Sequence, residues 1–384
     1  MKIKKFVIRI LKRGCSLMNT LIPKNSKKIV FLSIPDYTGN SKAFYEYIKK
    51  NHNNYSTYWL VKPTFHRKKS NFVNKNNILA IYHYMTSKYI VSTHNEMVGI
   101  AGKNQIYISL WHGMPFKKIC YLGDIDHIGM EDYSAKRICT SELMRSIISA
   151  SFHEKANNVY VTGQPRNDLL YEEYPIRNII NDIPENKKII YYIPTFRENM
   201  NNHKYSDGER IKDNNFLRVI DFDINLIDEF LEKINCILIL KLHPYEEEYF
   251  KDIQALSKNI FNLKSSSLSE KNVDINQILS QSECLITDYS SVYFDYLILN
   301  KPIIFLTPDI KTYRKKRGGF TLEPFDQWTP GKKVTSQTEL LIELSYLFVE
   351  NRDNYKEKRN SINNIINKYQ DNNNSWRVYE KFFK

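Results

Sequence analysis

Short hydrophobic runs alternate with helical patterns along most of the chain. Runs typical of buried β-strands lie at residues 28–33, 57–61, 78–81, 89–93, 105–110, 137–140 and 159–162, and then at 188–193, 236–242, 259–263, 283–287 and 302–306. Helical patterns at 42–50, 223–233, 275–280 and 292–299 separate several of these runs. This alternation favours parallel sheets built from βαβ units.

The strand pattern stops and starts again around a polar stretch at residues 181–187. Two successive sets of strands and helices predict an α/β protein with two Rossmann-like domains. We expect the first domain at 28–185 and the second at 186–384. The length of 384 residues suits two domains of ordinary size.

Residues 1–27 carry a basic amphipathic pattern. The apolar residues that recur at helical spacing are Ile3, Phe6, Val7, Ile10, Leu11, Leu17, Met18 and Leu21, and those largely on the other side are Lys2, Lys5, Arg9, Lys12 and Arg13. Such a helix lies in a membrane interface with its apolar face down, so we predict peripheral contact with an anionic membrane surface. A helix packed on the body of the protein and a transit peptide are the alternatives. Charges interrupt the apolar run that a secretory signal needs.

The charge balance changes the picture of possible partners. Fifty-six Lys and Arg against 42 Asp and Glu give a net charge of +14. This excess fits nucleic acid, an acidic membrane or phosphorylated substrates, although a general abundance of lysine also explains it. A nucleic-acid-binding motif such as a helix-turn-helix or an RNP-like aromatic pattern is not recognisable.

The sequence provides no support for a metal site, a disulfide framework or a membrane span. The five cysteines form no CxxC pair, and a reducing, cytoplasmic compartment fits them best. No apolar run approaches the ~18 residues that a spanning helix requires. We predict neither a cofactor nor a protein-bound metal.

Polar residues gather where the predicted strands end. In doubly wound sheets, ligands bind beyond the carboxyl ends of the strands. The segment SLWHGMPFKKI (109–119) places His112 there, where an imidazole can take a proton from a hydroxyl. The segment VTGQPRNDLL (161–170) makes Arg166 available for a phosphate.

The second set of strands shows the same arrangement. The strand-end segments are IPTFRE (193–198) with Thr195 and Arg197, ILILKLHP (237–244) with Lys241 and His243, and CLITDYSS (284–291) with Asp288, Ser290 and Ser291. The two serines can cap the next helix and offer hydroxyls beside its amides, which makes an anion site. Each segment alone has an ordinary structural explanation, but five such strand ends together indicate an enzyme with a phosphate-bearing ligand.

Together with ITDYSSVYFDYLILNKPIIF (286–305), Tyr313 and GGFTLEPFDQWTPG (318–331), these segments resemble the CDP-glycerol glycerophosphotransferase family of teichoic acid enzymes. The resemblance runs from about residue 92 to 348. It implies the GT-B fold, with two facing Rossmann-like domains and an active-site cleft between them. It also implies transfer of glycerol phosphate or ribitol phosphate from a CDP-alditol to a lipid-linked or polymer acceptor, with release of CMP. Members are similar to peripheral proteins of the cytoplasmic membrane face.

The resemblance also implies roles for individual residues. The first domain would meet the acceptor and the second the CDP-linked donor, with helices in 340–383 crossing back to the first domain. His112 would be the general base, and His243 a second catalytic residue that acts on the pyrophosphate. Donor and phosphate contacts would come from Trp111, Gly113, Met114, Pro115, Arg166, Pro194, Thr195, Arg197, Lys241, Asp288, Ser290, Ser291 and Asp295.

Two residues depart from the family pattern. Met114 replaces the threonine of the usual HGTP loop, and Gln164 stands where an aromatic residue is common. The donor, the acceptor, the number of units added, and a wall or capsular product stay open. A GT-B glycosyltransferase that uses a nucleotide sugar is the main alternative, because it would share the fold.

Overall fold

The computed structural model describes residues 2–65, 69–124, 126–128, 130–197 and 214–384, with the backbone alone for 2–6 and 317. The chain forms two compact units. Unit 1 comprises Met1–Met114, Gly129–Leu169 and Asp371–Lys384, and unit 2 comprises Pro115–Ile128 and Leu170–Gln370. We expected one division near residue 185, whereas the polypeptide passes between the units after Met114, Ile128, Leu169 and Gln370.

Unit 1 is built on a parallel sheet. Its seven strands among the described residues follow the order β3-β2-β1-β4-β5-β6-β7, and each neighbouring pair is parallel. The strands are β1 (Asn25–Leu32), β2 (Ser56–Val61), β3 (Phe72–Asn74), β4 (Ser87–Ser92), β5 (Ile106–Ser109), β6 (Lys136–Cys139) and β7 (Val159–Val161). The expected parallel sheet is confirmed, and all its carboxyl ends lie along one edge.

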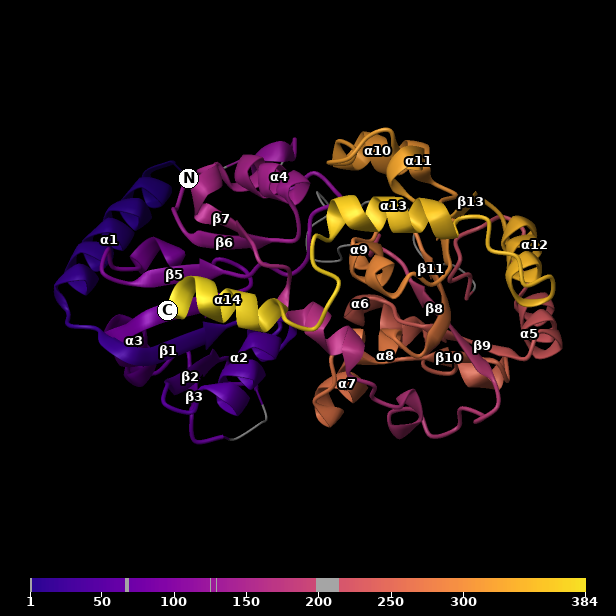
Figure 1. Ribbon diagram of the computed structural model, residues 1–384, viewed down its shortest axis with the longest axis horizontal. Helices are drawn as coiled ribbons and strands as arrows, with labels where there is room; N and C mark the ends of the chain where they lie inside the picture. The colour runs from indigo at the N-terminus through magenta and orange to yellow at the C-terminus, as the bar shows by residue number, and fades with distance from the viewer. Residues whose placement is uncertain (1, 66–68, 125, 129, 198–213) are drawn as a thin grey trace. The chain divides into compact units, whose positions relative to one another are not determined.

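Helices of unit 1 come from both ends of the chain. They are α1 (Lys2–Leu21), α2 (Gly39–Asn51), α3 (Ile78–Thr86), α4 (Glu142–Phe152) and α14 (Asn374–Phe383). Helix α14, yellow in Figure 1, joins the hydrophobic core of this unit through Phe382 and Phe383. The ring of Phe383 lies 5.5 Å from that of Phe44 in α2. The last ten or so residues are therefore part of the first core.

The expectation of a strand at 78–81 is wrong, because these residues begin helix α3. Asn77 caps this helix, with its side-chain oxygen accepting a hydrogen bond from the Leu79 amide at 2.9 Å. Ala80 and Tyr84, four positions apart, face the core, while Ile78 is largely exposed. The edge strand is instead β3, a less hydrophobic segment that precedes the helix.

Unit 2 repeats the parallel arrangement. Within the described residues its sheet has six strands in the order β10-β9-β8-β11-β12-β13, all paired in parallel. They are β8 (Lys188–Ile193), β9 (Cys236–Leu240), β10 (Ile260–Asn262), β11 (Ser282–Thr287), β12 (Ile303–Leu306) and β13 (Lys332–Val334). The strands that we expected in this half are confirmed.

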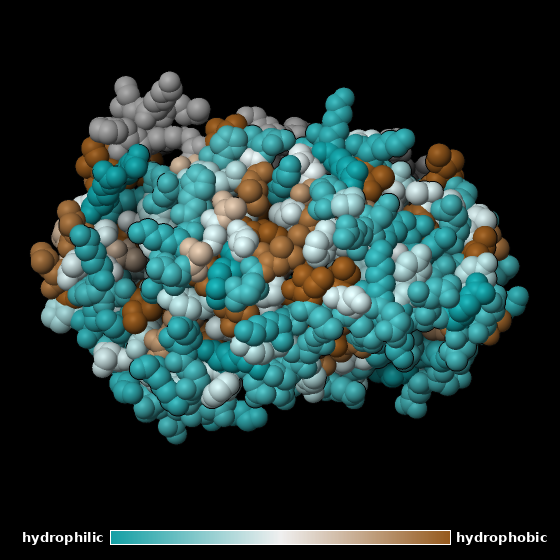
Figure 2. Space-filling view, turned by 45° about the horizontal axis from the view of Figure 1, so that its top comes forward, coloured by the Kyte–Doolittle hydropathy of each residue, from teal (hydrophilic) through white to brown (hydrophobic). Residues whose placement is uncertain are grey.

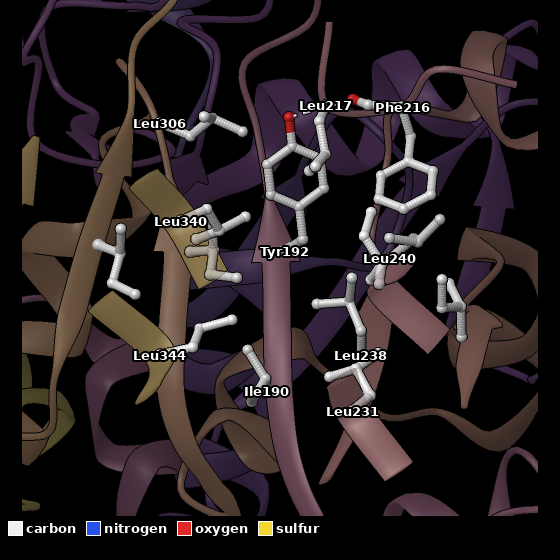
Figure 3. Packing of buried hydrophobic residues seen from close by; sticks show 14 of the residues in the cluster. Ile190, Tyr192, Phe216, Leu217, Leu231, Leu238, Leu240, Leu306, Leu340 and Leu344 are labelled. Carbon is white, nitrogen blue, oxygen red and sulfur yellow. Dashed lines mark hydrogen bonds between the residues drawn. The ribbon is translucent and has the colours of Figure 1, made fainter. Parts of the chain in front are cut away.

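Helices cover the sheet of unit 2. They are α5 (Ile224–Lys233), α6 (Pro244–Glu247), α7 (Ser265–Lys271), α8 (Ile275–Leu279), α9 (Val292–Tyr296), α10 (Ile310–Arg317), α11 (Phe325–Trp328), α12 (Gln337–Phe348) and α13 (Lys356–Ile366). Figure 3 shows how Ile190 and Tyr192 of β8 and Leu238 of β9 pack against leucines of α5 and α12. This apolar layer holds the central strands, and thereby the loops that follow them.

Candidate active site

The loop after β5 presents His112. Trp111 has a left-handed backbone (φ +52°), and Gly113 has φ +143°, a conformation that favours glycine. The turn leaves the side chain of His112 exposed and that of Met114 buried. The Trp111 ring packs edge-on against Phe152 of α4, with ring centres 4.7 Å apart. The predicted base therefore lies on a turn that is held in place by the contact between Trp111 and α4.

A second histidine supports the first. The ring of His94, which follows β4, lies parallel to that of His112, with centres 4.2 Å apart and planes at 6°. Burial, reinforced by the nearby Lys75 charge, lowers the pKa of His94 to about 4. His94 is therefore neutral near pH 7 and stacks on His112 without charge repulsion. We did not predict His94, although it follows a strand as directly as the residues that we singled out.

Arg166 connects two distant motifs. Its Nη1 atom donates a hydrogen bond to the His112 carbonyl at 2.7 Å, and its backbone amide donates to Asn40 Oδ1 at 3.0 Å. The buried Asn40 in turn donates to the carbonyls of Leu110 and Trp111 at 3.1 and 3.0 Å. The HGMP and TGQPRND segments thus share one network at the carboxyl edge of the sheet. Asn40 carries no motif that reveals this role.

Two other residues of the TGQPRND segment hold the C-terminal helix. A Cβ atom on Gly163 (φ +75°) would lie 1.8 Å from the side-chain oxygen of Asn374. The carboxylate of Asp168 accepts hydrogen bonds from the backbone amides of Asn374 and Ser375, each at 2.8 Å. Both residues thus have a structural reason to be what they are, independent of any ligand.

In unit 2 a buried ion network joins the loops after β8 and β11. Arg197 Nη2 lies 2.6 Å from Asp288 Oδ2, and Arg197 Nε lies 2.9 Å from Asp309 Oδ2. Asp288 also accepts a hydrogen bond from the Thr195 amide at 2.7 Å. Arg197 and Asp288 are almost completely buried. We predicted three of these residues, and the structure brings them together with Asp309, which we did not predict.

The network keeps its charges despite burial. Burial alone raises the pKa of Asp288, but Arg197 and the hydrogen bonds around it lower that pKa overall. Burial likewise lowers the pKa of Arg197, and the two carboxylates more than reverse this effect. The guanidinium also lies over the rings of Tyr289 and Tyr313, at 4.8 and 5.1 Å from their centres. Arg197 is therefore a fixed cation shared by two acids.

The turn after Asp288 matches only part of the expected helix cap. The amides of Tyr289 and Ser290 donate to Asp288 Oδ1, at 2.5 and 3.2 Å. Ser290 Oγ accepts a long 3.5 Å hydrogen bond from the Val292 amide. The side chain of Ser291 makes no capping hydrogen bond to α9, so that expectation is wrong. Both serine side chains are half-buried. Asp295 is buried within α9.

Lys241 and His243 have different environments. The ammonium of Lys241 donates to Glu247 Oε1, Ser265 Oγ and the Leu242 carbonyl, at 2.7–2.8 Å. These acceptors match the three N–H groups of a lysine, so this arrangement leaves no donor for a phosphate. His243 is half-buried, and its ring stacks on Phe196 with centres 4.3 Å apart.

The hydrogen bonds of His243 define its protonation. Its Nδ1 atom accepts a long hydrogen bond from the Tyr245 amide at 3.4 Å, at the start of α6. Burial, followed by the positive charge of Lys241, lowers the pKa of His243. The ring is therefore neutral near pH 7 and carries its proton on Nε2, which makes Nε2 a hydrogen-bond donor.

Two prolines mark the start of loops. Pro194 follows β8 directly and leads into the Thr195 turn. Pro115 is the first residue of unit 2, and its carbonyl accepts a 2.7 Å hydrogen bond from Thr321 Oγ1. The next residues continue this contact through an antiparallel bridge between Lys117 and Phe320. The HGMP loop is thus continuous with the segment that enters unit 2.

The family model for CDP-glycerol:poly(glycerophosphate) glycerophosphotransferases matches residues 15–384. The chain belongs to this family. A teichoic acid poly(glycerol phosphate) polymerase of Bacillus spizizenii is 28% identical over 389 residues, which cover 94% of this chain and 92% of the relative. A teichoic acid poly(ribitol-phosphate) polymerase of the same species is 29% identical over 342 residues. That match covers 84% of this chain, and the chain spans about half the length of this and some other relatives.

The fold is also that of a solved relative. The wall teichoic acid polymerase TagF superposes with a TM-score of 0.76 at 22% identity, covering 99% of this chain and 96% of that structure. Together with the two parallel α/β sheets, this similarity confirms the GT-B-like fold. The predicted enzyme class, a CDP-glycerol glycerophosphotransferase of teichoic acid synthesis, is confirmed at the level of the family.

The structure explains both departures from the family pattern. Met114 is buried, so its side chain does not face the solvent. Gln164 is buried too, and its Oε1 atom accepts a 3.4 Å hydrogen bond from Asn40 Nδ2. Gln164 therefore belongs to the network that holds the His112 loop. Met114 is thus a buried apolar residue at the end of the loop, whereas Gln164 acts through its hydrogen bond.

Two features are absent from the part of the chain that the structure describes. No group of three or more His, Cys, Asp or Glu side chains within them is arranged to hold a metal ion. None of the helices described in the structure has the length and apolar character needed to cross a membrane.

Proposed function

We propose that this protein transfers glycerol phosphate or ribitol phosphate from a CDP-alditol to a lipid-linked or polymer acceptor and releases CMP. The observation that carries this proposal is the meeting of family motifs at the carboxyl edges of the two sheets. Arg166 joins the HGMP and TGQPRND segments in unit 1. The Arg197–Asp288 pair joins the IPTFRE and ITDYSS segments in unit 2. Membership of the family favours this reaction over sugar transfer from a nucleotide sugar.

His112 supplies the general base in this proposal. Its side chain is exposed, and the stacked neutral ring of His94 fixes its orientation. The acceptor hydroxyl gives its proton to the imidazole while its oxygen bonds to the phosphorus that carries the alditol. The bond from that phosphorus to the bridging oxygen breaks, and CMP leaves with the electron pair. Positioning and charge neutralisation provide most of the catalysis in such a transfer.

Unit 2 binds the donor in this proposal. The Nε2–H group of His243 donates to a phosphate oxygen, and the hydroxyls of Ser290 and Ser291 lie on the loop after β11. Arg197, Asp288 and Thr195 position these loops through their buried network. Lys241 has a similar supporting role through Glu247. The proposed division therefore separates groups that touch the donor from charges that hold the loops.

The decisive experiment follows CMP release from CDP-glycerol, CDP-ribitol and a UDP-sugar with a lipid-linked primer as acceptor. We expect CMP from one CDP-alditol and no sugar transfer. Sugar transfer without CMP release would refute the proposed reaction. A comparison of the two alditols identifies the donor, and the product length distinguishes single addition from polymerisation.

We also propose that the protein works at the cytoplasmic face of the membrane, with α1 as its contact. Exposed apolar side chains cover one side of this helix, among them Leu11 at 62% and Met18 at 66% exposure. Its polar side packs on unit 1, where Asn19 is fully buried and donates to the Ile100 carbonyl at 2.8 Å. Figure 2 shows brown hydrophobic groups at the end of unit 1 where α1 lies. The cysteine usage fits a reducing compartment.

Substitution of the apolar face tests this contact. L11S/M18S should lower binding to anionic vesicles, because the apolar surface that enters the interface is lost. The variant keeps the buried Asn19, so the helix stays docked. Deletion of residues 1–23 should weaken binding further, and added salt should do the same by screening the basic residues. Unchanged vesicle binding by both variants would place the membrane contact elsewhere.

A further inference from the structure

A cavity of about 720 Å³ lies in unit 1 between one flank of α1 and the sheet. Its walls include Gln105 and Ile106 at the start of β5, Lys136 at the start of β6, and Asn158 just before β7. These are the amino ends of the strands, whereas His112 follows a carboxyl end. A strand of four residues spans roughly 10 Å, so the cavity is separate from the candidate active site.

The cavity is lined by five basic side chains and two acidic ones. Lys12 is already neutralised, with its ammonium 3.3 Å from Glu131 and 3.1 Å from the Tyr133 hydroxyl. Arg9 and Arg13, by contrast, are exposed and have no ion-pair partner among the described residues. Two guanidinium groups, which suit bidentate contact with a phosphate, therefore point to an anionic occupant.

The cavity borders the apolar face of α1. Arg9, Arg13 and Leu17 follow one another at intervals of four residues, so they form one row along the helix. Leu17 lines the cavity and is also 62% exposed. The row therefore separates the docked polar side of the helix from the apolar side. A molecule with an anionic head and an apolar body matches both surfaces at once.

We propose that this cavity binds the phosphate headgroup of an anionic phospholipid from the bilayer on which α1 lies. This inference rests on the proposed membrane contact and adds a specific site to it. Arg9 and Arg13 hold the phosphate, and Lys103 and Lys136 add positive charge around it. The Tyr133 hydroxyl, which accepts a hydrogen bond from Lys12, offers its own proton to the rest of the headgroup. The acyl chains continue along the apolar face of α1.

Binding of a soluble lipid tests this site. Dihexanoyl phosphatidylglycerol, kept below its micelle concentration, is titrated into the full-length protein and the heat is measured. R9A/R13A should bind this lipid roughly 30-fold more weakly, because each basic contact with an anionic lipid contributes roughly a fivefold step. The matched control K49A/K50A removes the same charge from exposed positions in α2, which lies well apart from α1 in Figure 1. It should bind like the wild type.

Further arms separate the possible occupants. Dihexanoyl phosphatidylcholine, which has no net charge, should bind at least 10-fold more weakly. Inorganic phosphate should displace the anionic lipid only at a large excess, and displacement at equal concentration would assign the cavity to free phosphate. Lipid binding that is equal in wild type and R9A/R13A would overturn the proposal. CMP release from CDP-glycerol, measured in detergent, should be unchanged in R9A/R13A, so a failed headgroup site is distinguishable from a failed transferase assignment.

Discussion

Unit 2 holds its motif residues through buried ion pairs, whereas unit 1 holds its His112 loop through hydrogen bonds to backbone carbonyls and through stacked rings. In unit 2 the charge of Arg197 is shared between Asp288 and Asp309. In unit 1 the amide of Asn40 and the ring of His94 brace the His112 loop. A charged residue in a motif therefore need not touch a ligand. In Arg197 the charge is neutralised by Asp288, which belongs to another motif.

The loops at the carboxyl edges of the two sheets also differ in what they contribute. Buried ion pairs hold the unit 2 loops in one geometry. Separation of the partners would leave an unpaired charge in a low dielectric, which is energetically costly. The unit 1 loop leaves His112 exposed with the neutral ring of His94 stacked against it, which suits a residue that must gain and lose a proton. Mutations should therefore affect stability most in unit 2 and turnover most in unit 1.

The largest expected effect is that of Arg197→Ala. It leaves Asp288 and Asp309 without their shared cation, and removal of one partner of a buried pair costs about 3–5 kcal/mol. We expect loss of hydrogen-exchange protection in β8 and β11 and loss of activity with it. The control Arg314→Ala removes an exposed pair with Glu323 in the same unit, which is worth about 0–1 kcal/mol. Equal melting temperatures for the two variants would contradict the structural role of Arg197.

His112→Ala should reverse this pattern. The side chain is exposed, so the melting temperature should stay near that of the wild type. Loss of a general base lowers turnover by typically 10²–10⁴-fold. Donor affinity should hardly change, because the base acts in the transition state. A stable variant with near-normal CMP release would end the assignment of His112 as the base.

His243 should show an intermediate effect that depends on the replacement. His243→Ala removes both the proposed phosphate contact and the N-cap of α6, whereas Asn restores a good N-cap without an imidazole. Both variants should therefore bind the CDP-alditol more weakly and turn over more slowly. The alanine variant alone should also lose about 1 kcal/mol of stability. Full recovery of donor affinity in His243→Asn would show that His243 acts only as a helix cap.

At neutral pH the smallest effect is that of His94, whose contribution changes only as the pH decreases. Its folded-state pKa of about 4 lies below the ordinary 6.5. Between these values the unfolded chain binds a proton and the folded chain does not, so stability falls as the pH decreases from about 6.5 to 4. His94→Phe keeps an aromatic ring against His112 but cannot titrate, so this part of the pH dependence should disappear. Urea denaturation of both proteins at pH 7, 5.5 and 4.5 makes the comparison.

Asp288 should respond only at lower pH. Its pKa is depressed below the ordinary 3.8, so its contribution to stability is complete above that value and is lost as the pH falls through the folded-state pKa. A loss that began above pH 5 and required Asp288 would contradict the charged pair with Arg197.

The pattern of apolar and polar residues predicted most strands, the parallel sheets and the place of each motif after a strand. This prediction succeeds because the buried strands of parallel βαβ units appear in a sequence as short hydrophobic runs. It also succeeds because the carboxyl ends of parallel strands share one edge of the sheet. His112, Arg166, Arg197 and Asp288 were found for this reason. The same rule would have found His94. The helix at Ile78–Thr86 was missed because a short apolar run reads equally well as a strand or a helix.

Only the tertiary structure decided which of these residues bind one another. The carboxylate of Asp168 meets Asn374 more than 200 residues later, and Arg197 meets Asp288 and Asp309 about a hundred residues later. No local pattern encodes such pairs, since they depend on the register of strands that are distant in sequence. The docking of α1 by its polar face is a further example, because its amphipathic pattern alone does not say which face meets the protein. Charge and hydrophobicity are properties of single residues, but the fold decides which partner neutralises a charge and which residues cover an apolar side chain.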